Sequence, residues 1–324
     1  MSEIIVDWGS TNFRAFLVTD GKIIDRRTAP GHGVLQLYAA AFSDARLLNN
    51  EAYRTKFYAD ILRAQTGPWL QRHEIFTIFM CGAIGSREGW LNTGYCDAPA
   101  GLSSLAKSIR YLDAHENGGF LEARIGILPG LATRRHGRYD IMRSEEIKSL
   151  GALTHFGLRD GVFCIPGTHC KWVTVKEGRI VDFYSVMTGE LYNILQINGS
   201  LAPLLTGQQQ EDEQSFIQGL ALSAEGHDLL SDLWQVRSQK IRAEYPPQHL
   251  QSYLSGILIG HELRQAKSVI KDPQNLILLS DFGNRQKCYR RAIESAGWTV
   301  TNEIESETAV CEGMLGLISL CRQT

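Results

Sequence analysis

The sequence predicts an α/β fold made of two related halves. The stretch 4–18 is apolar at both ends and polar in the middle, which is typical of a strand, a turn and a second strand. The stretch 163–183 repeats this pattern about half a chain later, with Gly167-Thr168 in the turn. Such a repeat indicates two copies of one unit, here 1–150 and 151–324. Two ordinary hairpins that look alike by chance are the alternative.

Around these hairpins, apolar runs that suit buried strands alternate with stretches of helical periodicity, which predicts layers of helices on sheets. The expected strands are 22–27, 75–80, 123–128, 276–279 and 299–301. The expected helices are 43–71 with an interruption at Gly67-Pro68, 102–115, 211–226, 228–239, 253–266, 286–296 and 308–320. The basic stretch 133–139 is expected to be a surface loop.

Composition narrows the class of protein. The 324 residues are 44% hydrophobic and 21% charged, as in a globular protein, and the net charge of −2 gives no reason to expect nucleic acid or an anionic membrane as partner. No apolar run reaches the ~20 residues that span a bilayer, and no leader precedes the first strand. Seven cysteines without a CxxC spacing argue against a disulfide framework or zinc site, so we expect a cytoplasmic protein.

The first turn carries groups that suit phosphate. Gly9 lets the backbone approach a ligand closely, and Ser10, Thr11 and Asn12 offer hydroxyls, an amide and backbone N–H donors. Asp7 ends the preceding strand, where a carboxylate can hold a metal through water. No GxxxxGK[ST], GxGxxG, HExxH or GxSxG motif is present. Their absence argues against a P-loop kinase, a nicotinamide dehydrogenase, a zincin or an α/β-hydrolase.

Three further stretches are candidates for a site, and each has a simpler structural alternative. Gly33 lies in a loop that follows the third strand, and that loop is equally well a plain turn. The strand 75–80 opens into the glycine-rich loop 81–90, where Arg87 and Trp90 either contact substrate or cover the surface. Ser144 is a good N-cap for a helix that begins with two acids; helix-end chemistry alone is the alternative there.

These segments resemble the superfamily of sugar kinases, actin and Hsp70, and more closely the 2-dehydro-3-deoxygalactonokinase family. The matching segments occur in the family's order along both halves. They are Asp7-Trp8-Gly9-Ser10-Thr11-Asn12, Gly85-Ser86 with Gly89-Trp90, Met142-Arg143 with Glu145-Glu146, Pro166-Gly167-Thr168-His169-Cys170-Lys171-Trp172-Val173, Thr188-Gly189-Glu190-Leu191, and Leu254-Ser255-Gly256 with Leu258-Ile259-Gly260.

The resemblance implies two ribonuclease-H-like domains with a central cleft, and the ATP- and Mg²⁺-dependent phosphorylation of 2-dehydro-3-deoxy-D-galactonate at its 6-hydroxyl. It implies that Glu145 is the catalytic base, and Glu146 is the second candidate for this role. The residues it implies for the nucleotide and metal are Asp7, Gly9, Ser10, Thr11, Asn12, Gly167, Thr168, His169, Lys171 and Gly283, with Asp7 on the metal. The residues expected at the sugar acid are Arg14, Gly33, Ser86, Arg87, Trp90 and Arg143.

The sequence departs from the family pattern at two places. Ser144 stands where the family usually has glycine, and the turn 280–283 keeps only Gly283 of a usually glycine-rich nucleotide turn. Phe282 either stacks on adenine or crowds it. A kinase for another sugar acid, such as the gluconate epimer, a phosphatase, or a non-catalytic nucleotide-binding protein are the alternative readings. A homodimer is compatible with the sequence, which does not decide the oligomeric state.

Overall fold

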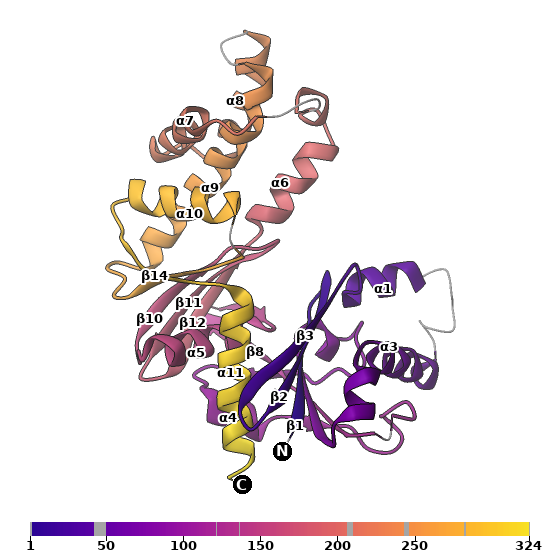
Figure 1. The fold of residues 1–324 in the computed structure, drawn as a ribbon. Helices are drawn as coiled ribbons and strands as arrows, with labels where there is room; N and C mark the ends of the chain where they lie inside the picture. Colours follow the sequence, from indigo (N-terminus) through magenta and orange to yellow (C-terminus); the bar gives the residue numbers. More distant parts are fainter. Residues whose placement is uncertain are drawn as a thin grey trace. The chain divides into compact units, whose positions relative to one another are not determined.

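The computed structural model describes residues 2–41, 50–120, 122–135, 137–205, 210–242, 246–281 and 283–323 (Figure 1). The chain forms two compact units. Unit 1 comprises Met1–Arg159, Val175–Asp182 and Glu307–Thr324, and unit 2 comprises Asp160–Thr174 and Phe183–Ser306. The C-terminal helix therefore belongs with the N-terminal unit, whereas the expected halves kept it in the second. None of the described helices is long and apolar enough to cross a membrane.

Unit 1 is built on a six-stranded sheet with the strand order β3-β2-β1-β4-β7-β6. The strands are β1 (Ser2–Trp8), β2 (Asn12–Thr19), β3 (Lys22–Pro30), β4 (Ile75–Cys81), β6 (Arg110–Tyr111) and β7 (Arg124–Ile127). β1 pairs antiparallel with β2 and parallel with β4, and all seven of its residues are buried. It is therefore a central strand, and the polar turn after it leaves the middle of the sheet.

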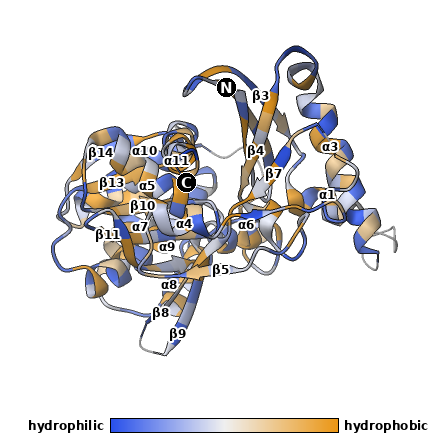
Figure 2. Ribbon diagram, turned by 90° about the horizontal axis from the view of Figure 1, so that it is seen from below, coloured by the Kyte–Doolittle hydropathy of each residue, from blue (hydrophilic) through white to orange (hydrophobic). Residues whose placement is uncertain are grey.

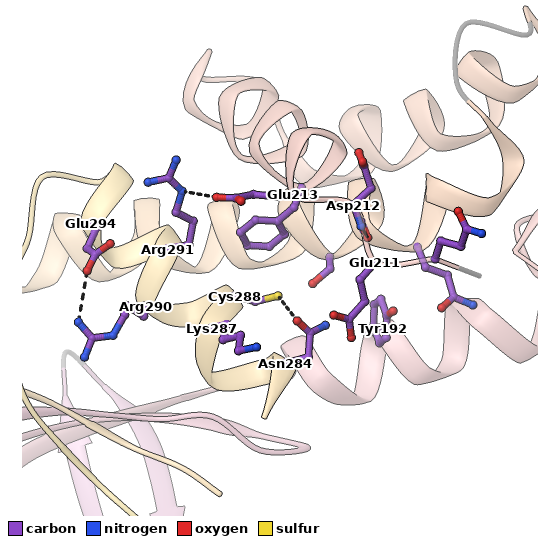
Figure 3. A pocket seen from close by; sticks show the side chains of 15 residues that line it. Tyr192, Glu211, Asp212, Glu213, Asn284, Lys287, Cys288, Arg290, Arg291 and Glu294 are labelled. Carbon is purple, nitrogen blue, oxygen red and sulfur yellow. Dashed lines mark hydrogen bonds and ion pairs between the residues drawn. The ribbon is translucent and has the colours of Figure 1, made fainter. Parts of the chain in front are cut away.

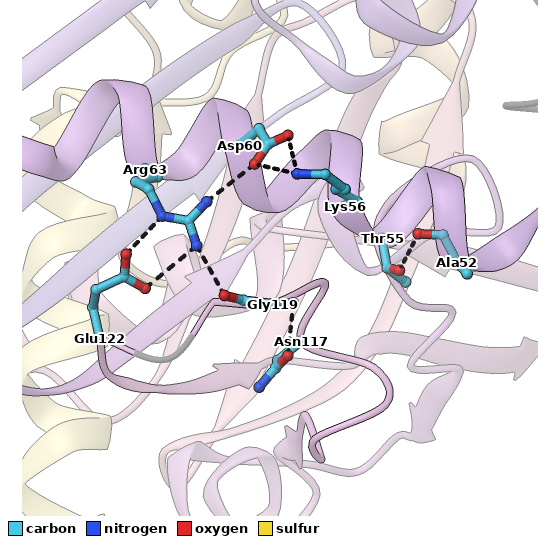
Figure 4. Close-up of polar contacts among 8 residues, drawn as sticks. All are labelled: Ala52, Thr55, Lys56, Asp60, Arg63, Asn117, Gly119 and Glu122. Carbon is cyan, nitrogen blue, oxygen red and sulfur yellow. Dashed lines mark hydrogen bonds and ion pairs between the residues drawn. The ribbon is translucent and has the colours of Figure 1, made fainter.

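The helices of unit 1 are α1 (Val34–Ala41), α3 (Glu51–Arg72), α4 (Leu102–Lys107), α5 (Glu145–Phe156) and α11 (Ser306–Cys321). α3 packs its Tyr58 and Leu62 into the same hydrophobic core as Val6 and Trp8 of the sheet. Outside the core, Arg63 of α3 donates to Glu122 at 2.6 Å and to the Gly119 carbonyl at 3.1 Å, which fixes this loop against the helix (Figure 4).

Several expected elements differ in the structure. Pro68 does not interrupt α3. The proline removes only one intrahelical hydrogen-bond donor, and the buried side chains of Thr66 and Trp69 on either side of it hold the helix against the core. The expected helix 102–115 ends at Lys107, and its remainder includes the edge strand β6. The expected loop 133–139 instead overlaps the hairpin of β8 (Gly130–Arg135) and β9 (Arg138–Met142), which joins β5 (Tyr95–Asp97) in a small third sheet. Residues 43–49 of the first expected helix lie outside the described residues.

The second large sheet, most of which belongs to unit 2, has the order β12-β11-β10-β13-β14. Its strands are β10 (Gly161–Ile165), β11 (Cys170–Lys176), β12 (Arg179–Val186), β13 (Leu276–Leu279) and β14 (Val300–Ile304). In chain order its first four strands follow the arrangement third-second-first-fourth, as in the first sheet. β10 pairs parallel with β13, as β1 does with β4. The repeated order confirms the α/β prediction with two ribonuclease-H-like sheets.

Helices of unit 2 pack on the second sheet and on one another (Figure 1). They are α6 (Thr188–Ile197), α7 (Glu213–Ala224), α8 (Leu229–Ile241), α9 (Leu250–Val269) and α10 (Asn284–Ser295). Phe216 of α7, Ile259 of α9 and Tyr289 of α10 pack with Trp172 and Leu278 of the strands. Hydrophobic residues accordingly concentrate along β10 and β13 (Figure 2), whose nine residues are all buried.

Candidate active site

The first polar turn, residues 9–12, is held from below by the start of α1. The carbonyl oxygens of Gly9 and Ser10 accept the N–H groups of Val34 and Leu35 at 2.9 and 3.1 Å. Gly33 packs so closely that an added Cβ would lie 2.2 Å from the Thr11 backbone. The turn is thus fixed through its carbonyls, while the side chains of Ser10 and Thr11 stay exposed. Gly33 supports this turn rather than offering a side-chain contact.

The second polar turn, residues 166–169, is supported in the same way by the start of α6. Glu190 donates its N–H to the Thr168 carbonyl at 2.8 Å, and an added Cβ on Gly189 would lie 2.2 Å from the Gly167 oxygen. The carboxylate of Glu190 also lies 2.6 Å from His169 Nε2. Gly189 is therefore the counterpart of Gly33. The repeat extends from the hairpin to the helix start beneath it, a correspondence that we did not predict.

Asp7 is the centre of a buried polar cluster in unit 1. It is 3% exposed, and its Oδ1 accepts a hydrogen bond from Ser144 Oγ at 3.1 Å. Its Oδ2 lies 3.5 Å from Arg14 Nη1 and 3.7 Å from Lys148 Nζ. Burial lowers the pKa of Lys148, but the negative charges of Asp7 and Glu145 outweigh it, so that the pKa is raised overall. The cluster therefore holds a charged lysine beside the first turn.

Ser144 contributes its hydroxyl to this cluster from an unusual backbone conformation. Its φ of 89° lies in the left-handed region, which side chains other than those of Asn, Asp and His rarely enter. A glycine would adopt this backbone without strain but would have no hydroxyl for Asp7. Serine at this position thus adds one hydrogen-bond donor to the Asp7 cluster.

Glu145 and Glu146, which begin α5, have different environments. Glu145 is partly exposed, and its Oε2 accepts the Arg143 N–H at 3.0 Å. Glu146 is 0% exposed, and its Oε1 accepts the Ser144 N–H at 2.9 Å. Among the residues that the structure describes, Glu146 Oε2 has no hydrogen-bond partner. Only Glu145 is accessible to a substrate hydroxyl.

Burial and then the charge of Glu145 raise the pKa of Glu146 to about 8. Between pH 4.5, its ordinary pKa, and about 8, the folded chain keeps a proton that the unfolded chain has released, so stability falls as the pH rises through this window. We expect the urea midpoint of the wild type to decline over this range. E146Q mimics the protonated carboxyl and should decline less, whereas E74Q, at an exposed position, should follow the wild type. Parallel curves for wild type and E146Q would contradict the buried proton.

The residues expected at the sugar acid are only partly available. Arg143 donates to Thr93 Oγ1 at 2.9 Å and to the Gly94 carbonyl at 3.0 Å, and its guanidinium lies 4.6 Å from the ring centre of Tyr95. Trp90 is 0% exposed and donates its Nε1 to the Glu116 carbonyl, so it belongs to the core. Arg87 is exposed. Of these three, Arg87 is the one placed to meet a ligand from solvent.

Ser86 and Arg14 are intermediate cases. Ser86 is half-buried and donates its hydroxyl to Glu88 at 3.2 Å. The Arg14 side chain is 21% exposed and pairs with Asp7. Arg14 therefore reaches the Asp7 cluster and solvent at once, as a residue that meets a charged ligand would.

Unit 2 contains a pocket of about 770 Å³ between the start of α7 and helices α6, α9 and α10 (Figure 3). Its lining mixes charged and uncharged groups: Tyr192, Gln210, Glu211, Asp212, Glu213, Phe216, Gln251, Ser252, Ser255, Asn284, Lys287, Cys288, Arg290, Arg291 and Glu294. Gly283, which the resemblance implied at the nucleotide, immediately precedes the lining residue Asn284. Phe282 lies outside the described residues. Lys171, also implied at the nucleotide, is 6% exposed at the start of β11, next to the second turn.

Two functional candidates were missed from the sequence. Lys148 joins Asp7 although the two residues are 141 positions apart, and only its place one turn after Glu145 on α5 could have drawn attention to it. Gly189 was part of a matching segment, but its close approach to Gly167 depends on how α6 packs under the turn.

Two sheets that share the order of their first four strands, each with a polar turn braced by a helix start, give the chain the fold of the sugar kinase and actin superfamily. The model of the family described as 2-keto-3-deoxy-galactonokinase matches residues 7–317. The chain belongs to this family, and it is a kinase.

Characterised and solved relatives agree with this assignment. The chain is 29% identical over 311 residues to the 2-dehydro-3-deoxygalactonokinase of Escherichia coli (strain K12), covering 96% of this chain and 95% of that protein. A crystal structure from Sinorhizobium meliloti, named as that of a putative 2-dehydro-3-deoxygalactonokinase, is 26% identical to this chain. It superimposes with a TM-score of 0.80 over 99% of this chain and 98% of the other.

Proposed function

We propose that the protein transfers the terminal phosphoryl group of ATP to the 6-hydroxyl of 2-dehydro-3-deoxy-D-galactonate, a step of galactonate catabolism. Family membership over residues 7–317 is the observation that carries the proposal. We place the reaction in the cytoplasm, where ATP is supplied. We assign the sugar acid and the reacting groups to unit 1 and the nucleoside of ATP to the pocket of unit 2.

Phosphoryl transfer depends on positioning and charge neutralisation. We assign the proton of the attacking hydroxyl to Glu145, which is the accessible one of the two acids that begin α5. Lys148 would offset negative charge that develops on the phosphoryl oxygens. The exposed hydroxyls of Ser10 and Thr11 and the second turn would donate to the triphosphate. Arg87 or Arg14 would pair with the substrate carboxylate, because guanidinium groups bind carboxylates through a two-pronged fork.

We include Mg²⁺ in the proposal, because the groups around Asp7 suit an ion that is held through water. Two cations within 4 Å of Asp7 Oδ2 disfavour direct ligation of a divalent ion. Asp7 Oδ2 would therefore meet a metal-bound water rather than the ion itself. Mg²⁺ characteristically keeps several waters and binds phosphate oxygens. When bound, it would neutralise charge on the triphosphate, and Asp7 would orient it through water.

An ADP-release assay with the purified protein tests the substrate. We expect ADP release that requires 2-dehydro-3-deoxy-D-galactonate, slower release with the gluconate epimer, and a 6-phosphate product identified by phosphorus NMR. Faster turnover of the epimer would reassign the substrate, and ADP release without any sugar acid would indicate hydrolysis. ATP binding without ADP release from either sugar acid would favour a non-catalytic nucleotide-binding protein.

A further inference from the structure

Glu262 of α9 is a buried carboxyl group in unit 2 that the proposed reaction does not use. It is 2% exposed and accepts hydrogen bonds from three side chains. Trp172 Nε1 and the Tyr289 hydroxyl donate to it at 2.9 Å each, and the Thr188 hydroxyl donates to the same oxygen as Tyr289. Removing a carboxyl group from water is costly unless its oxygens find such donors. Three convergent donors therefore indicate a built site rather than a chance contact.

The three donors come from the elements that carry the nucleotide side of the proposed site. Trp172 lies on β11, four residues after Thr168 of the second turn. Thr188 begins α6, directly before Gly189, whose Cα lies against the turn. Tyr289 belongs to α10, which also lines the pocket of unit 2. One carboxyl group thus connects the strand after the turn, the helix start beneath it and a wall of the pocket.

One of these connections passes through α6. Thr188 is 7% exposed and is followed by Glu190, whose N–H bonds to the Thr168 carbonyl and whose carboxylate meets His169. A shift of Thr188 would therefore move both of these contacts, together with the close approach of Gly189 to Gly167. The matching turn of unit 1 is braced by α1 through backbone contacts, so the tie to Glu262 belongs to the second turn.

We propose that Glu262 is the positioning residue of the second turn, which it holds in place for the phosphates of ATP through Thr188 and the start of α6. The inference rests on the proposed function, because that function makes the second turn a phosphate site. Glu262 itself touches no substrate in this account. It acts by fixing the turn before ATP arrives, which lowers the cost of ordering on binding.

A metal site is the competing interpretation of the same residues. Ligand atoms of Cys164, Cys170 and Glu262 lie within 4.8 Å of one another, and all three residues are buried. However, the two oxygens of Glu262 already accept three hydrogen bonds. Burial also raises the pKa values of both thiols, which opposes the thiolate form that binds metal. Zinc at one equivalent in the purified protein would overturn the hydrogen-bonded assignment; metal-free active protein is expected.

The cleanest test removes the Thr188 hydroxyl. T188V should raise the KM for ATP about tenfold, since a hydrogen bond to a carboxylate is lost and the turn is no longer fixed, and should leave the KM for the sugar acid within about twofold. T66V is the matched control: Thr66 is a buried threonine of unit 1 whose hydroxyl donates to Leu62 within its own helix. T66V should leave both KM values unchanged. Equal KM values for ATP in T188V and T66V would overturn the proposal.

Variants of Glu262 itself give a second, independent arm. E262A leaves three donors without an acceptor and should weaken ATP binding at least as much as T188V. E262Q should recover most of it, because the amide oxygen still accepts from Trp172 and the two hydroxyls can rotate to accept from the amide. If E262A does not fold, T188V and E262Q carry the test. E262Q weaker than T188V would contradict a role through hydrogen bonding.

Calorimetry with ATP separates this inference from the proposed function. If the wild type binds ATP but phosphorylates no sugar acid, the substrate assignment fails while the loss of ATP affinity in T188V still supports the role of Glu262. If the wild type is an active sugar-acid kinase and T188V binds ATP normally, only the role of Glu262 fails.

Discussion

Replacing Glu145 with glutamine should lower turnover by ~10²–10⁴ while ATP still binds. Glutamine keeps the size of the side chain and can still accept the Arg143 N–H, but it cannot take the proton of the attacking hydroxyl. Turnover would be measured by ADP release at saturating ATP and sugar acid, and ATP affinity by calorimetry.

The neighbouring glutamate supplies the matched control. Glu146 is fully buried and, with a pKa of about 8, protonated at neutral pH, so E146Q resembles the group that is already there. We expect E146Q to keep near-normal turnover. Near-normal turnover of E145Q together with a large loss in E146Q would move the base to the buried acid and would require α5 to open during the reaction.

The central parts of the fold could be predicted from local sequence patterns. The hairpin 4–18 and its repeat at 163–183 correspond to strands at the centre of two sheets. They could be predicted because each strand and its partner are neighbours in the chain. The predicted strand 276–279 coincides with β13, whose four residues are all buried and apolar. The pattern failed at 133–139, where exposed basic residues hid the strands β8 and β9.

The site was predicted less completely, because its geometry depends on contacts between distant segments. Asp7 and the two turns could be found from residue type and repetition. Trp90 was selected as an aromatic residue in a glycine-rich loop, yet the loop turns it into the core. Lys148 was overlooked, since a lysine on a helix is usually exposed, and only the packing of α5 brings it to Asp7. Glu262 was likewise overlooked, because its three hydrogen-bond donors come from three elements that are distant in the chain.

Lys148 is the second position at which we expect a large effect. K148M should lower kcat by ~10²–10³, because the partly buried cation at Asp7 would stabilise charge that develops in the transition state. K56M is the control: Lys56 is an exposed lysine of α3 that pairs with Asp60 at 2.9 Å on the surface (Figure 4). It should behave as the wild type. Equal kcat values for K148M and K56M would contradict a catalytic role.

A purely structural role for Lys148 can be separated from a catalytic one. Lys148 also compensates the buried charge of Asp7, so K148M should lower the melting temperature. In D7N/K148M both charges are gone, and because the two groups are in contact their effects on stability should not add. We expect the double variant to regain stability but to turn over more slowly than D7N alone, which already lacks the carboxylate that orients the metal. Equal turnover of D7N and D7N/K148M would show that the lysine serves only to neutralise Asp7, and the charge on the transferred group would then have to be offset by Arg14 or by the metal.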